Sequence, residues 1–222
     1  MRVFAAGVTA AFVLAACAAP ADGPSPTTAP GVPAATDPAA PVNPARIDRV
    51  RTELPGGYEV AGLGDGATPV TLWGFGGDWA ADPAECAALA DPVADPATTR
   101  GWSGSGPGGI VYVAVSAGSP PDPALVDRCA QWALSSGHTS ATVTLLAGPA
   151  VADAATTGMS TAATTVVEGG TETRSHADTF RADLADHVVF VTVVTDPGSP
   201  NPPLGQDFAA ELLVKTVSAL RS

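Results

Sequence analysis

Runs of apolar residues in the second half of the chain predict a β-sheet. Residues 187–195 contain six large apolar side chains, and residues 110–115 form a second continuous apolar run, which is typical of buried strands. Residues 140–146 alternate between polar and apolar positions, as a half-buried strand does. Gly169 and Gly170 separate two segments rich in Thr and Val, which predicts a hairpin. Shorter strands are predicted at residues 58–63 and 70–75.

Helical spacing is clearest at the C-terminal end of the chain. Residues 206–220 place five large apolar side chains on one side, so an amphipathic helix is expected to pack on the sheet. Residues 45–54 predict a short helix, and the pairs Asp82-Pro83 and Asp122-Pro123 are typical helix starts. The second of these helices is expected to run to Gly137. The fold class is therefore α+β, with a mainly antiparallel sheet in a single domain over residues 45–222.

The first 16 residues have the layout of a secretory signal. One positive charge at Arg2 precedes an uncharged stretch from Val3 to Ala16, which is too short to span a membrane. Leu14-Ala15-Ala16-Cys17 resembles the bacterial lipobox, at which the cysteine is acylated and the chain is cut before it. The resemblance implies a lipid anchor on Cys17 and a location on the outer face of the cell membrane. Ordinary cleavage at an A-x-A site is the alternative.

A tether of low complexity follows this cysteine. Residues 18–44 contain eight prolines and few large apolar side chains, so residues 17–44 are expected to form a semi-stiff tether rather than a core. The signal segment contains one arginine, so the chain from Cys17 has nine basic and 22 acidic residues and a formal charge of −13. So acidic a chain is not expected to bind nucleic acid.

Two cysteines remain once Cys17 carries lipid. Cys86 and Cys129 have no CxxC or Cys/His spacing that would indicate a metal site. In an oxidising compartment the pair predicts a disulfide, with free thiols or a metal pair as the alternatives.

Candidate catalytic motifs are incomplete. Residues 104–109 match G-x-G-x-x-G, but an apolar strand follows them instead of a helix, so a tight turn or a lid over a cleft is expected there. Ser103 and Ser105 lack the G-x-S-x-G context of a hydrolase elbow. A serine triad would need one of the three histidines nearby. We therefore expect no enzyme, no cofactor and no metal, and keep a hydrolase as the least favoured hypothesis.

Two groups of residues are candidates for ligand binding. Glu172, Arg174, His176 and Asp178 alternate and would share one strand face; a wet sheet face is the simplest interpretation, and recognition of a polar ligand through Arg174 is the functional one. Ligands on one strand lie too far apart to form a compact metal site unaided. The second candidate is a cleft lined by Trp79, Arg100 and Trp102, which would suit an amphiphilic or carbohydrate-like ligand.

The lipobox and tether, Ile47-Asp48-Arg49-Val50 through Leu54-Pro55-Gly56-Gly57-Tyr58, residues 103–109 and residues 188–203 together resemble mycobacterial envelope lipoproteins with a domain of unknown function. The order of elements is loosely similar to the extracellular sensor domains of mycobacterial receptor kinases. The resemblance implies an anchored domain that binds a ligand or an envelope protein in the cell wall space. A scaffolding module without a small-molecule site is the alternative.

Overall fold

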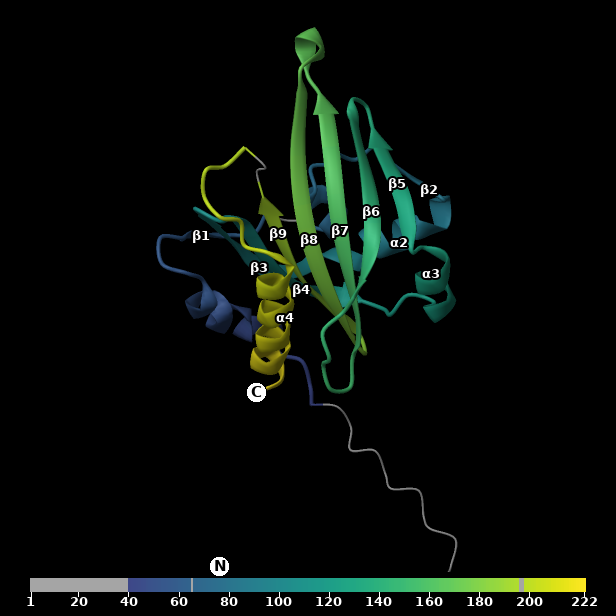
Figure 1. The fold of residues 1–222 in the computed structure, drawn as a ribbon. Coiled ribbons are helices and arrows are strands. Elements are labelled where there is room, and N and C mark those ends of the chain that lie inside the picture. The colour runs from purple at the N-terminus through teal and green to yellow at the C-terminus, as the bar shows by residue number, and fades with distance from the viewer. Residues whose placement is uncertain (1–39, 65, 196–197) are drawn as a thin grey trace, which may run out of the picture. The chain divides into compact units, whose positions relative to one another are not determined.

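The computed structural model describes residues 40–64, 66–195 and 198–222, which form one antiparallel sheet with helices on both faces (Figure 1). The strands are β1 (Glu59–Gly62), β2 (Ala80–Asp82), β3 (Val93–Gly106), β4 (Gly109–Gly118), β5 (Gln131–Ser136), β6 (Thr139–Ala147), β7 (Ala155–Val166), β8 (Glu172–Leu184) and β9 (His187–Thr195). The α-helices are α1 (Pro69–Leu72), α2 (Ala87–Ala90), α3 (Pro123–Arg128) and α4 (Gln206–Arg221). The 3-10 helices are η1 (Pro44–Glu53), η2 (Ala84–Cys86) and η3 (Glu168–Gly170).

The strand order is β1-β3-β4-β9-β8-β7-β6-β5-β2, and every neighbouring pair is antiparallel. The valine-rich strand β9 lies in the interior of the sheet, between β4 and β8, because both of its faces are apolar and must be buried. The α+β class predicted from the sequence is confirmed.

Each face of the sheet has its own core. On one face, here called the α4 face, α4 and η1 cover Val113, Phe180 and Val191. The opposite face is covered by α1, η2, α2 and α3, whose buried residues pack on Val143, Met159 and Ala177. Alternation along β8 separates the two cores, since Ala177 faces one and Phe180 the other.

The disulfide predicted from the sequence is present. Cys86 at the end of η2 and Cys129 just after α3 are joined, with sulfur atoms 2.06 Å apart, and both residues are fully buried. The bridge lies within the core of the opposite face and links the two short helical segments that cover it.

Three local predictions are wrong. Residues 70–75 are not a strand: Pro69–Leu72 is a turn of helix, in which the Thr71 hydroxyl bonds to the backbone of Thr68. The helix after Pro123 ends at Arg128, and Trp132 lies in β5 instead. Asp82 does not cap a helix but ends β2. Each misassigned segment is short, so its type depends on packing rather than on its own periodicity.

Candidate functional site

A pocket of about 590 Å³ lies at the end of the sheet where β9 stops, and we call it the end pocket. Its walls come from the β3–β4 turn, the first residues of β8, the last residues of β9 and the segment that leads to α4. The described lining residues are Ser105, Gly106, Pro107, Gly108, Gly109, Ile110, Thr173, Arg174, Ser175, Val194, Thr195, Gly198, Ser199, Pro200, Asn201 and Pro203. This volume is in the usual range of ligand sites.

The wall formed by the β3–β4 turn is held rigidly. The backbone N–H of Gly108 donates to the Tyr58 hydroxyl at 3.1 Å, and its carbonyl accepts from the Leu204 N–H at 2.9 Å. A Cβ at Gly108 would lie 2.8 Å from both the Tyr58 hydroxyl oxygen and Leu204 Cγ, so only glycine fits. Of the two possibilities for residues 101–109, the structure therefore selects the turn: they complete β3 and form a tight connection to β4.

Arg174 is the only charged side chain among the described residues that line the end pocket. Its Nη2 lies 3.6 Å from Oε2 of Glu172, and the two side chains are 73 and 54 % exposed. An ion pair this open contributes little, because water screens it. The guanidinium therefore remains available to an acidic ligand.

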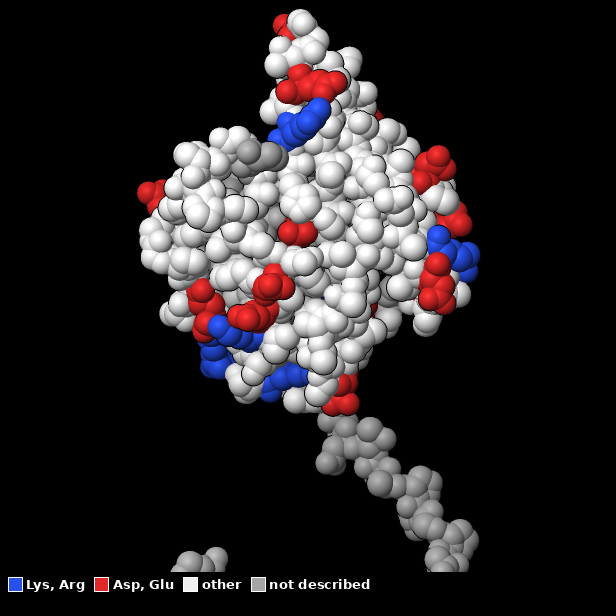
Figure 2. All heavy atoms as spheres, viewed as in Figure 1, with Lys and Arg blue, Asp and Glu red and all other residues white. Residues whose placement is uncertain are grey.

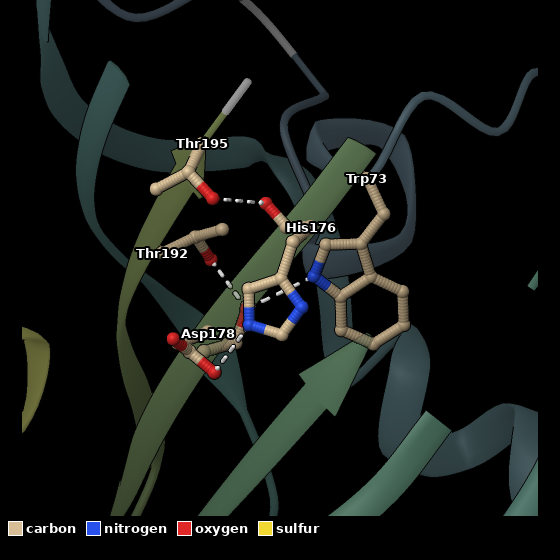
Figure 3. A network of polar contacts seen from close by, with 6 residues as sticks. Trp73, His176, Asp178, Thr192 and Thr195 are labelled. Atoms are coloured by element: carbon tan, nitrogen blue, oxygen red, sulfur yellow. Dashed lines mark hydrogen bonds and ion pairs between the residues drawn. The ribbon is translucent and has the colours of Figure 1, made fainter. Parts of the chain in front are cut away.

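Below Arg174 on the same face, His176 and Asp178 form a polar pair (Figure 3). His176 Nε2 lies 3.1 Å from Oδ1 of Asp178, and that hydrogen bond raises the pKa of His176 above its ordinary value of 6.5. Asp178 is only 7 % exposed, so its carboxylate depends on this partner. No cluster of three or more His, Cys, Asp or Glu residues suited to a metal occurs in the described ranges.

A second polar chain on the opposite face is structural. Trp73 Nε1 donates to the Thr179 hydroxyl at 2.9 Å, and that hydroxyl lies 2.8 Å from the Thr192 hydroxyl. Trp73 and Thr192 are labelled in Figure 3. All three residues are buried, so these bonds fix the end of α1 on β8 and β9.

The predicted cluster of Trp79, Arg100 and Trp102 does not form. Trp102 is fully buried under η1, where its Nε1 donates to the Ile47 carbonyl at 3.1 Å. Trp79 packs against the core of the opposite face, and Arg100 is exposed on β3. Of the proposed ligand-binding residues, only Arg174 reaches the end pocket. Cys17 lies outside the described residues.

No catalytic pairing is found among the described contacts of the candidate serines. Ser103 lies on β3 and Ser105 on the pocket wall, and no hydrogen bond among the described residues joins either serine to His138, His176 or His187. His187 instead bonds through Nδ1 to its neighbour Asp186 at 2.7 Å.

Several lining residues had no signal in the sequence. Gly109, Val194 and Thr195 have the composition of an ordinary strand end and turn. Their role arises only from the sheet order, which brings the β3–β4 turn beside β9. Figure 2 shows that charged atoms on the α4 face gather near its rim and on the projecting β7–β8 hairpin, while its centre is mostly uncharged.

The geometry defines an α+β domain with a pocket at the end of a central strand. The chain belongs to the family of DUF5642 domains, a domain of unknown function whose family model matches residues 43–221. It is similar in structure to an uncharacterised Mycobacterium smegmatis protein, described as the Rv0999 ortholog, with a TM-score of 0.59 and 20% identity over 82% of this chain and 98% of that one. This similarity shows a shared fold with a mycobacterial protein. No curated protein matches the chain significantly.

Proposed function

We propose that the protein is a lipid-anchored binding protein of the cell envelope, and that its ligand occupies the end pocket. The single observation that supports binding most directly is the pocket itself, with an exposed arginine at its edge and rigid backbone walls. Binding is favoured over catalysis because the described lining residues offer one cation and small neutral side chains but no acid–base pair. Cofactors and metals have no part in this function.

The proposed location rests on the N-terminal sequence and on the cysteines. Leu14-Ala15-Ala16-Cys17 supplies an acylation motif, and a proline-rich tether follows it. Cys86 and Cys129 are joined in the structure, and disulfides persist in oxidising compartments such as the cell wall space. No helix in the described part of the chain is long and apolar enough to cross a membrane. The lipid on Cys17 would thus attach the domain to the membrane.

Fractionation of cells tests the anchor. Wild-type protein is expected in the membrane fraction, with an acylated N-terminal Cys17 visible by mass spectrometry. The variant Cys17→Ala should move to the soluble fraction, because it lacks the cysteine to which the lipid would be attached. Membrane association of Cys17→Ala at the wild-type level would contradict the proposal.

Native mass spectrometry tests the pocket. The protein is purified from an actinobacterial host as wild type, as Thr173→Trp and as Thr142→Trp. Both threonines are exposed strand residues, but only Thr173 lines the end pocket. A bound molecule should be present in wild type and Thr142→Trp and absent from Thr173→Trp. Equal retention in all three would place binding elsewhere.

A scaffolding role is the second candidate, and one observation favours it. Val166 and Val167 are 41 and 46 % exposed, and they lie side by side near the tip of the β7–β8 hairpin. Figure 1 shows this hairpin projecting beyond the rest of the sheet. Exposed apolar side chains on a projecting element are typical of a contact with another protein.

A further inference from the structure

The outer strand β1 has one edge that no strand of the described chain pairs with. It stands first in the strand order and pairs only with residues 102–105 of β3. All four residues of β1 are exposed, so the described chain leaves both faces of the strand largely uncovered. An edge of this kind is a template for pairing with another chain.

One hydrogen bond shows which backbone groups lie on the open edge. The N–H of Leu63, just after β1, donates to the Gly101 carbonyl of β3 at 3.2 Å. Because backbone groups alternate in direction along a strand, Ala61 also faces β3, whereas the N–H and carbonyl groups of Val60 and Gly62 point away from it. No hydrogen bond joins these four outward groups to another part of the described chain.

The two outer strands of the sheet differ in how far they are protected. The strand β2 is three residues long and ends at Asp82, which Pro83 follows. The strand β1 contains no lysine and no proline, and its pairing with β3 has no bulge. Charges, prolines and bulges are the usual means by which an edge is kept from pairing. The edge of β1 is therefore the more suitable one for a partner strand.

A second copy of this chain matches the edge. When two β1 strands pair antiparallel around Ala61, Val60 of each copy lies opposite Gly62 of the other, and all the outward groups are paired. Val60 is 43 % exposed, and a Cβ at Gly62 would meet nothing within 4 Å, so the valine has room beside the glycine. Glu59, the one charged residue of β1, lies opposite Leu63 of the other copy, so like charges do not face each other.

We propose that the protein forms a symmetric dimer in which the β1 strands of two copies pair antiparallel around Ala61 and join the two sheets into one. This inference goes beyond the proposed function, because no residue of β1 lines the end pocket. Four residues give a smaller contact than stable dimers have, so the association is weak and depends on protein concentration.

Disulfide trapping tests the register of the two strands. In the dimer, the Ala61 residues of the two copies form a non-hydrogen-bonded pair with Cα atoms about 4.5 Å apart, which a disulfide can bridge. Full-length Cys17→Ala/Ala61→Cys has one free thiol, because Cys86 and Cys129 are joined, and it should form a covalent dimer on mild oxidation. In the matched control Cys17→Ala/Glu59→Cys, the thiol is on the same face of β1, but the two copies of residue 59 lie about 14 Å apart, so it should stay monomeric.

A third variant tests the backbone pairing. Gly62→Pro, added to Cys17→Ala/Ala61→Cys, removes an outward N–H but no bond to β3, and it should lower the yield of covalent dimer at least about tenfold. Proline is tolerated on an edge strand, and circular dichroism verifies that the variant is folded. If it is not folded, the comparison of Ala61→Cys with Glu59→Cys carries the test.

Three results would overturn the inference. They are no covalent dimer from Ala61→Cys, equal yields from Ala61→Cys and Glu59→Cys, and an undiminished yield when folded protein also carries Gly62→Pro. None of them bears on a molecule in the end pocket, so the proposed function would stand or fall separately.

Discussion

The buried ion pair on β8 allows a quantitative prediction. Arg181 and Asp183 are joined by an ion pair, and their side chains are 1 and 2 % exposed. Nε and Nη1 of Arg181 have no hydrogen-bond partner in the described part of the chain. Thr157 on β7 and Phe190 on β9 lie opposite Arg181. The charge of Arg181 therefore depends on Asp183 alone among these neighbours.

Removing one partner leaves the other charge buried. Asp183→Ala should lower the free energy of unfolding by about 3–5 kcal/mol, since the guanidinium stays desolvated without compensation. A domain of this kind has about 5–15 kcal/mol in total, so the variant should be close to unfolding at moderate temperature. The double variant Arg181→Met/Asp183→Leu removes both charges, and it should be as stable as wild type or more stable.

Urea denaturation followed by circular dichroism measures these differences. The matched control lies on the same strand at the same spacing: Glu172→Ala breaks the exposed pair with Arg174 and should cost less than about 1 kcal/mol. The reasoning is refuted if Asp183→Ala costs no more than this control. It is also refuted if the double variant is less stable than the single one.

Three further outcomes follow from the same structure. The double variant Cys86→Ala/Cys129→Ala should lose about 4 kcal/mol for a bridge that spans 43 positions, and an unchanged denaturation midpoint would contradict this. The hydrogen bond to Asp178 raises the pKa of His176, so the protonated pair stabilises the fold fully below pH 6.5, and this stabilisation is lost as the pH rises through the folded pKa of His176. Asp178→Asn should abolish this pH dependence of the free energy of unfolding. Gly158→Ala should cost about 1–3 kcal/mol in thermal unfolding, because its Cβ would lie 2.6 Å from the Phe180 ring, and a neutral effect would argue against that contact.

The long, strongly patterned elements could be predicted from the sequence. Residues 110–115 and 187–195 are apolar on both faces, as buried strands are, and residues 206–220 have one apolar side, as a surface helix does. The hydrophobic pattern alone therefore predicts whether each segment is a strand or a helix. The hairpin around Gly169 was also predictable, since both central glycines have positive φ values of 85 and 78°.

The strand β3 and the beginning of β7 could not be predicted in this way. Gly101, Gly104 and Gly106 resemble a flexible loop in the sequence, yet each lies in a strand. A Cβ at Gly101 would lie 2.2 Å from the Val113 carbonyl, and one at Gly106 would lie 2.5 Å from the Tyr58 ring. These glycines are present because of close packing between distant segments, which a local pattern does not reveal.

The candidate site was predictable only in part. Arg174 was found because alternate polar residues mark one face of a strand. The tryptophan cluster was wrong because Trp102 lies in β3 rather than in a loop, and its side chain is buried in the core under η1. The end pocket depends on where β9 stops relative to β8, and this register is a property of the assembled sheet.

Native mass spectrometry of full-length protein purified from an actinobacterial host tests the end pocket most directly. A bound molecule should be present in wild type and in Thr142→Trp and absent from Thr173→Trp, because only Thr173 lines the end pocket. A molecule that all three proteins retain equally, or the absence of any bound molecule from wild type, would contradict the account.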